Sequence, residues 1–445
     1  MQTYAAKIWH LRLKPGKELI ASHTLFRLLS LCNKDKSLFP ALKTVIISMP
    51  SGFISQDTDF QSLNSVFLAI TSPSLSALSI TDITFSTEDF ATSVLTAASV
   101  DCIEINQITL QGHLTIKSLE IIPQFLQLRN INLRLFNCVL PSAVLLQLGS
   151  ALVHLKSINL SLDDSTFDTT TIPTTVVAPT NFNGLESMEL KGSSVEIARF
   201  LGIVRPNQGT SPLQAIRLNF PSHWNTGGQE AVAVCIQECG RISPSSLRLL
   251  QMRGGRGLTL ARGSLSPLAH CEKLETLDIR DVTVSLVDDD IQDICAAGRW
   301  NTLQTLRLPN SPDGQAPSLF SIRQLSDSCS NLHTLSISSD FRLCEYQVLQ
   351  EAILDPFNDN NLQSLTILDV LTVERAVVMP NTMMLAIAVS RFLEHHFRRL
   401  VSMEYAGSRS NEWWTGVRTN MIQYRNIRAE MISITSQDQE GTTSN

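Results

Sequence analysis

The sequence has no excess of basic residues and no block of them. Its 35 Lys and Arg stand against 41 Asp and Glu, which gives a formal net charge of −6. A general nucleic-acid binder needs a clustered basic excess, because its cationic side chains must displace the counterions that surround phosphate groups. The charge balance therefore argues against nucleic acid as a partner.

The cysteines lack a regular pattern. There are nine of them, an odd number, scattered without the tight and even spacing of a secreted disulfide framework. The N-terminus, Met1 to Tyr4, leads directly into a repeat-like strand and does not show the features of a signal peptide. No run of about 18 apolar residues predicts a membrane span. We therefore expect reduced cysteines, no membrane partner and a location in the cytosol or the nucleus.

Aromatic residues make up only 6% and charged residues only 17% of the chain, whereas hydrophobic residues reach 43%. This apolar material is ample for a folded core, and we expect disorder only in the polar tail over residues 434 to 445. A chain of 445 residues would ordinarily hold about three domains of roughly 150 residues. A repeat array escapes this expectation, because its core grows by the addition of units.

A six-residue phrase, with apolar residues at its first, fourth and sixth places, returns along the chain. Its clearest copies begin at Leu274, Leu303 and Leu332, with a period of 29 residues, which is the signature of a leucine-rich repeat. The register is weakest before residue 100, where Leu63 begins a competing copy. When Ile, Val or Met may replace Leu, the phrase occurs fourteen times, with first positions Ile8, Leu42, Leu75, Val100, Leu128, Leu155, Leu185, Leu213, Leu247, Leu274, Leu303, Leu332, Leu362 and Leu400.

Between the phrases, several segments place apolar residues three and four apart, which predicts helices. Such segments span residues 230 to 239, 288 to 298 and 321 to 329, and a longer one spans 382 to 397. Each unit therefore pairs a short strand with a helix, and stacking buries the apolar faces of both. We expect an α/β leucine-rich-repeat solenoid, a horseshoe over residues 1 to 433 with a parallel sheet on its concave face, helices on its convex face and a C-terminal helical cap over about 382 to 433.

Two repeats carry a fuller motif, in which a cysteine precedes the phrase. The segments from Cys271 to Ile279 and from Cys329 to Ile337 resemble the Cys-x-x-Leu-x-x-Leu-x-Leu units of the F-box leucine-rich-repeat proteins, in particular the large group found in mushroom-forming fungi. The segment from Tyr4 to Leu13 is similar to the stretch that joins the F-box to the first repeat in that group. The resemblance implies protein recognition, because in that family the F-box docks on a cullin-linked ubiquitin ligase and the repeats select its substrate.

The resemblance covers most of the chain but not the F-box. That element would lie upstream of residue 4, with a Leu-Pro start and a helical Val-Cys-x-x-Trp end, and neither occurs there. We therefore expect cullin-ligase components as partners only if an F-box is supplied upstream. The alternative is a free-standing regulator, in which a leucine-rich horseshoe inhibits an enzyme or activates a GTPase by direct contact. An enzyme is disfavoured, because no nucleophile, base and orienting group fall in a recognisable arrangement.

A ligand of such a scaffold would meet the concave face, on which strand alternation places the third, fifth and seventh residues of each phrase. Thirteen of the fourteen fifth positions are polar, and a solvated sheet face explains that on its own. The binding interpretation rests on arginines that fall on four successive strands with two polar neighbours, and the set is Arg217, Gln251, Arg253, Asp278, Arg280 and Arg307. Arginine grips carboxylate and phosphate with two parallel bonds, so we expect an acidic or phosphorylated protein segment as the partner.

Three other motifs have a plain structural explanation beside a functional one. The segment from Gly254 to Gly257 lacks the Gly-Lys-Ser/Thr end of a phosphate-binding loop and fits a repeat turn. The acidic run from Asp288 to Asp290 fits helix capping better than a metal site. Cys235, Cys239 and the pair His270-Cys271 lack a regular metal-ligand spacing and fit buried repeat positions. We therefore expect no metal and no cofactor.

Two adjacent tryptophans, Trp413 and Trp414, fall in the expected C-terminal cap. Tryptophan is enriched at binding hot spots, so the pair is a candidate anchor for a partner. The plainer interpretation is that one ring covers the end of the core and the other is half exposed.

Overall fold

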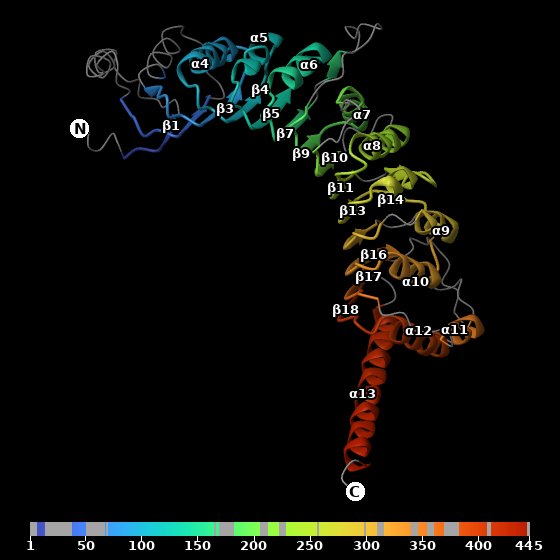
Figure 1. Ribbon diagram of the computed structural model, residues 1–445. Coiled ribbons are helices and arrows are strands. Elements are labelled where there is room, and N and C mark those ends of the chain that lie inside the picture. The colour runs from blue at the N-terminus through green and yellow to red at the C-terminus, as the bar shows by residue number, and fades with distance from the viewer. Residues whose placement is uncertain are drawn as a thin grey trace. The chain divides into compact units, whose positions relative to one another are not determined.

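The computed structural model describes residues 7–13, 38–49, 67, 70–163, 166–168, 182–204, 212–221, 228–255, 258–297, 300–308, 316–339, 346–353, 360–368, 382–406 and 411–442. The chain divides into two compact units, Met1–Ser246 and Leu247–Asn445. Each unit repeats a strand that leads through a helical or turn segment to the next strand, and the helices lie along one face of the sheet (Figure 1). The expectation of one solenoid over residues 1 to 433 concerns both units together and stays a prediction.

In its described residues the first unit has a sheet of eight strands, each paired in parallel with the next. In sheet order these are β1 (His10–Leu13), β2 (Thr44–Ser48), β3 (Ala77–Ile83), β4 (Gln107–Gly112), β5 (Asn130–Phe136), β7 (Ser157–Asp163), β9 (Ser187–Lys191) and β10 (Ala215–Asn219). Parallel neighbours require crossover connections, and those that follow β3, β4, β5, β9 and β10 are supplied by the described helices. These are α4 (Glu88–Asp101), α5 (Ile116–Leu119), α6 (Ser142–Ala151), α7 (Ser194–Ile203) and α8 (Gly228–Ile242), with a 3₁₀ turn η1 (Ile122–Gln124). Two short strands, β6 (Val139–Pro141) and β8 (Thr166–Asp168), pair separately.

The second unit follows the same plan with six strands among its described residues. They are β11 (Leu249–Arg253), β13 (Thr276–Arg280), β15 (Thr305–Arg307), β16 (Thr334–Ser338), β17 (Ser364–Leu368) and β18 (Ser402–Ala406), again all parallel. The intervening elements are η3 (Ser266–His270), α9 (Asp288–Ala296), α10 (Leu319–Ser328), α11 (Tyr346–Ala352), α12 (Thr382–His396) and α13 (Asn411–Thr442). A separate pair joins β12 (Thr259–Leu260) to β14 (Thr283–Val284). This alternation confirms the predicted α/β leucine-rich-repeat fold.

Burial follows the repeated phrase. In the copy that begins at Leu274, the residues Leu274 and Leu277 are fully buried and Ile279 is 1% exposed. Burying one such side chain contributes about 1.5–3 kcal/mol, so each repeat adds several kcal/mol to the core. The buried apolar residues of the phrase therefore hold the sheet and the helices together. The polar residues of the phrase are not needed for the core and can take part in binding.

One copy of the phrase is placed wrongly by the sequence. Val100 and Ile103, its expected first and fourth residues, lie on the surface with 72% and 71% of their area exposed. Helix α4 continues to Asp101, so no strand phrase can begin at residue 100. The core positions of this repeat come five residues later and are Ile105, Ile108 and Leu110. The competing copy at Leu63 lies outside the described residues.

Carboxylates at the first residue of a helix connect consecutive helices in both units, and of the two, Glu88 is buried whereas Asp288 is exposed. Glu88, the first residue of α4, accepts a hydrogen bond from the backbone N–H of Thr115 at the start of α5. Asp288, the first residue of α9, accepts from the N–H of Ser318 at 2.6 Å and from the hydroxyl of Ser321 at 2.5 Å, at the start of α10. The first N–H groups of a helix have no partner within it, so each carboxylate supplies one from the preceding repeat.

The first turns of α13 pack on α12 and cover the end of the second unit. Trp414 is 5% exposed, while Trp413 is half buried and meets it edge-on with ring centroids 4.8 Å apart, as the plainer interpretation of this pair expects. Glu394 of α12 is 3% exposed and forms ion pairs with Arg425 at 2.8 Å and with Arg428 at 2.7 Å. The helix is thus held by an apolar contact and by a charged one.

Helix α13 ends at Thr442, beyond residue 434, at which the sequence analysis places the start of a disordered tail. The stretch contains no proline, and its glycine, Gly441, comes one residue before the end of the helix. Polar residues alone do not end a helix, because Gln and Glu have good helix propensity. Among the described residues, no helix has both the length and the apolar character needed to cross a bilayer.

Candidate functional site

The residues singled out by the sequence divide between the two units. Arg217 lies on β10 of the first unit, and the remaining five lie on β11, β13 and β15 of the second. In register, Gln251 is opposite Asp278, Asp278 is opposite Arg307, and Arg253 is opposite Arg280. The structure thus brings together five residues, called here the arginine cluster, which are Gln251, Arg253, Asp278, Arg280 and Arg307.

Arg217 has a different setting. Within its own unit it is paired in register with Glu189 of β9, one strand away on the same face. Adjacent strands lie about 4.8 Å apart, and opposite charges on facing positions attract. The positive charge of Arg217 is therefore offset by a neighbouring acid, which the sequence analysis did not weigh.

Asp278 is the centre of the arginine cluster. It occupies a fifth position, on the polar face, and yet only 5% of it is exposed. Its two carboxylate oxygens accept hydrogen bonds from Nε and Nη2 of Arg280, each at 2.8 Å, and one oxygen also accepts from Nε2 of Gln251 at 3.3 Å. Nη1 of Arg307 lies 3.9 Å from the same oxygen. Long side chains from three strands therefore cover one carboxylate and neutralise it.

The two-pronged pair of Arg280 and Asp278 has an electrostatic consequence. Charge-assisted bonds of this kind are stronger than neutral ones and fix the orientation of both groups. The hydrogen bonds to Asp278 raise the pKa of Arg280 above its ordinary value, against a smaller opposing effect of burial. Arg280 is thus a charged residue that positions Asp278, and its guanidinium is largely committed to that role.

Two cations of the cluster remain open to solvent. Arg253 is exposed and has no ion pair with any residue that the structure describes. The side chain of Arg307 is 44% exposed and touches Asp278 only at the limit of an ion pair. Within the cluster, three arginines against one aspartate leave an excess of positive charge, which Asp281 beside Arg280 offsets in part. Screening over about 8–10 Å permits this on a solvated face, and an anionic ligand would offset it directly.

A row of hydroxyl groups on the same face was missed by the sequence analysis. The third positions of β13 to β18 are aligned in register and half buried, and they are Thr276, Thr305, Thr334, Ser364 and Ser402. A hydroxyl can donate or accept a hydrogen bond, so this row suits the polar groups of a peptide. Reading the third positions as well as the fifth would have revealed it.

The glycine-rich segment has a structural role at Gly254. A Cβ on this residue would come within 2.2 Å of Cγ2 of Val282, so a larger residue would clash with the neighbouring repeat. The N–H of Gly254 donates to the carbonyl of Arg280 at 2.8 Å, which joins the two repeats. This agrees with a repeat turn, although Arg256 and Gly257 lie outside the described residues.

The acidic run also has a structural role. Asp290 accepts from the N–H of Val287 at 3.0 Å in its own helix and from Nε of Arg262 at 3.1 Å, while Asp288 serves the next helix as described above. The expected capping is therefore present, and part of it crosses between repeats.

The cysteines considered as metal ligands lie in different units. Cys235 and Cys239 are fully buried on α8, and Cys271 is fully buried after η3, whereas His270 is exposed. Burial raises the pKa of Cys271 to about 11, which keeps its thiol protonated. In the part of the chain that the structure describes, no three His, Cys, Asp or Glu side chains gather so that they could hold a metal ion.

Comparisons with known proteins add little to this picture. No family model matches the sequence, and no curated protein matches it. Among solved structures, the chain is similar to a leucine-rich-repeat protein of Leptospira interrogans, with 14% sequence identity, coverage of 88% of each chain and a TM-score of 0.37. A likeness at this level carries no conclusion about function.

Proposed function

We propose that the protein is a non-catalytic scaffold that recognises another protein through the polar sheet face of its second unit. One observation supports this most directly. Asp278 is buried under Arg280, while Arg253 and Arg307 extend from neighbouring strands with much of their surface in solvent. The face therefore has an ordered polar centre with cations beside it.

The chemistry of the face favours an acidic or phosphorylated segment of the partner. Arginine binds carboxylate and phosphate in a two-pronged geometry, and the hydroxyl row lies on the same face. A hydrogen bond to a charged group contributes about 1.5–3 kcal/mol. Each engaged arginine would then change the affinity by roughly tenfold or more, since 1.4 kcal/mol corresponds to a factor of ten.

Two biological settings fit such a scaffold. In the first, the chain is the substrate-selecting half of an F-box ubiquitin-ligase adaptor, and cullin-ligase components join it only if an F-box is supplied upstream. In the second, it is a free-standing regulator that inhibits an enzyme or activates a GTPase by contact. The composition of the purified complex separates them. Ligase subunits indicate an adaptor, and one enzyme in stoichiometric amount without ligase subunits indicates a regulator.

The binding face is tested by fluorescence anisotropy with labelled octapeptides of alternating Gly and phosphoserine, and of Gly and Ser. We expect the full chain to bind the phosphorylated probe and to bind the Ser probe at least tenfold more weakly. Arg253→Glu and Arg307→Glu should each weaken binding by about tenfold or more. Arg391→Glu is the matched control, because Arg391 is exposed on α12 rather than on the sheet. Equal losses in all three variants would show that the face is not the binding surface.

A further inference from the structure

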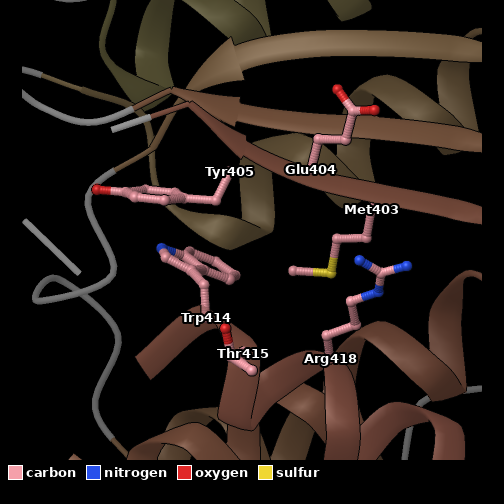
Figure 2. A pocket seen from close by; sticks show the side chains of 6 residues that line it. All are labelled: Met403, Glu404, Tyr405, Trp414, Thr415 and Arg418. Carbon is pink, nitrogen blue, oxygen red and sulfur yellow. The ribbon is translucent and has the colours of Figure 1, made fainter. Parts of the chain in front are cut away.

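A hollow lies between the last strand, β18, and the first turns of α13 (Figure 2). Its volume is about 290 Å³, and it is lined by Met403, Glu404, Tyr405, Trp414, Thr415 and Arg418. Ligand pockets usually measure about 300–1,000 Å³, so this hollow suits one or two side chains of a longer ligand. It is separate from the arginine cluster, which is formed by β11, β13 and β15.

The hollow adjoins a strand edge. On one side β18 pairs with β17, and the N–H of Ser402 at its start donates to the carbonyl of Gln363 at 3.0 Å. Because backbone groups alternate along a strand, the N–H and C=O of Met403 point to the opposite side. Within the described residues β18 is the last strand of this sheet. An edge of this kind can pair with the backbone of another chain.

Aromatic rings close one end of the hollow. The ring of Tyr405 stacks on that of Trp414, with centroids 5.4 Å apart and an interplanar angle of 22°. Trp413 also contacts Trp414, edge-on, with ring centroids 4.8 Å apart. This rigid surface offers an apolar contact at little entropic cost, because the rings are already ordered by each other.

A cation lies at the other end. In Figure 2 the guanidinium of Arg418 lies beside the thioether of Met403, while the carboxylate of Glu404 turns to the opposite side of the strand. Arg418 is exposed and has no ion pair with any described residue, in contrast to Arg425, which pairs with Glu394. The hollow therefore presents a positive charge, because the carboxylate of its acidic lining residue, Glu404, turns away from Arg418.

The spacing of the two ends is set by the backbone. Met403 and Tyr405 are two residues apart on a strand, which is about 6.6–6.8 Å. Trp414 and Arg418 are four residues apart on a helix, which is about 6 Å along its axis. The two residue pairs therefore have nearly equal spacing along the strand and along the helix, which places Arg418 near Met403 and Trp414 near Tyr405. An added strand would place its alternate side chains at this same interval.

We propose that this hollow binds an extended segment of a partner protein, added in parallel to the outer edge of β18. An acidic side chain of the segment meets Arg418, and an aromatic or large apolar side chain two residues later meets Tyr405 and Trp414. Backbone pairing supplies part of the affinity in this mode, and the two side-chain contacts supply specificity. The recognised pattern is an acid, any residue, and then an aromatic.

The test uses the full chain carrying Arg253→Glu and Arg307→Glu, so that an acidic probe cannot bind at the arginine cluster. A fluorescein-labelled peptide Gly-Ser-Glu-Thr-Phe-Ser-Gly is titrated by anisotropy, with Gln for Glu and Ala for Phe as controls. We expect each control peptide, and also the protein variant Arg418→Gln, to bind about tenfold more weakly. Arg391→Gln should bind like its parent, because this residue lies on α12 outside the hollow.

Two further readouts decide the mode of binding. In the Arg418→Gln protein, the Glu and Gln peptides should bind equally, because the group that distinguishes them is gone. A probe with an N-methyl group on the Thr amide should lose affinity about tenfold or more, because backbone pairing is then blocked. No binding of the Glu probe, equal binding of the Glu and Gln peptides by the parent, or full binding of the N-methyl probe would each overturn the proposal. These results do not depend on ligand binding at the arginine cluster, because the test protein already carries Arg253→Glu and Arg307→Glu. A failure of the proposed function at that cluster can therefore be distinguished from a failure of this proposal.

Discussion

Replacing Arg280 with Ala tests whether the exposed sheet face is held by a buried ion pair. The side chain of Asp278 is only 7% exposed, whereas that of Arg280 is 42% exposed. Removing the arginine leaves a covered carboxylate without its two strongest hydrogen bonds. A buried charge that loses its partner costs more than the pair was worth, because the charge has already lost its hydration.

The size of the effect follows from the exposure of the two groups. Breaking a fully buried pair costs about 3–5 kcal/mol, and breaking an exposed pair costs about 0–1 kcal/mol. The pair here lies between these limits, and Gln251 and Arg307 remain near the carboxylate. We therefore expect Arg280→Ala to destabilise the second unit by about 2 kcal/mol. For a unit of its size this corresponds to a lowering of the Tm by about 4–8 °C.

A double-mutant cycle in urea or thermal unfolding, followed by circular dichroism, measures the coupling. Asp278→Ala in the Arg280→Ala background should restore part of the lost stability, because no buried charge then remains unpaired. Arg253→Ala is the matched control and should change stability by no more than about 0.5 kcal/mol. If Arg280→Ala is no more destabilising than Arg253→Ala, the interpretation of Asp278 as a buried and paired carboxylate is wrong.

Three further predictions concern the rest of the fold. Asp288→Ala should lower the free energy of unfolding by about 1–2 kcal/mol, because it removes the hydrogen bonds to the start of the next helix. Asp289→Ala should change it little in the same urea titration, because it removes only an exposed ion pair with Arg262. Ile105→Ser should lower the free energy of unfolding by about 2–5 kcal/mol or more, and Ile103→Ser should leave it almost unchanged. A larger effect of Ile103→Ser would instead support the strand phrase that the sequence places at Val100. Burial raises the pKa of Cys329 to about 12. Its thiol should therefore resist alkylation by iodoacetamide at pH 8 until the chain unfolds, and mass spectrometry measures the alkylation. The stability that this raised pKa confers should be lost as pH rises from about 9 through 12.

The strands could be predicted from the sequence because their signal is local. Leucine or a similar residue at the first, fourth and sixth places fixes which side of each strand faces the core, and thirteen of the fourteen copies coincide with a strand. The error at Val100 has a local cause as well. Val100 lies in the last turn of α4, Ile103 and Ile105 follow the helix at the intervals of the phrase, and the pattern alone does not show where a helix ends. Only the pairing of Ile108 with Leu78 fixes that register.

The candidate site was predicted only in part. Strand register follows from the repeat, so the facing of Gln251, Asp278 and Arg307 was already implied by their common fifth position. The direction of the Arg280 side chain could not be predicted from the repeat. Fifth and seventh positions lie on one face about 6.6–6.8 Å apart, a gap that a long side chain can close in several rotamers. The sequence predicted arginines on successive strands, and the structure shows that one of them, Arg280, covers the carboxylate of Asp278, while Arg253 and Arg307 stay open to solvent.

The use of acids inside the fold explains how an acidic protein can present cationic surfaces. Asp278, Asp288 and Glu394 are each committed to groups within the second unit, two of them to arginines and one to a helix start. Their charges are therefore largely unavailable to an approaching ligand, while Arg253 and Arg418 have no carboxylate partner among the described residues. The net charge of −6 argues against broad binding to nucleic acid, because that requires an extended basic surface. It does not oppose a short anionic segment, since such a ligand responds only to charges within about one Debye length of its contacts.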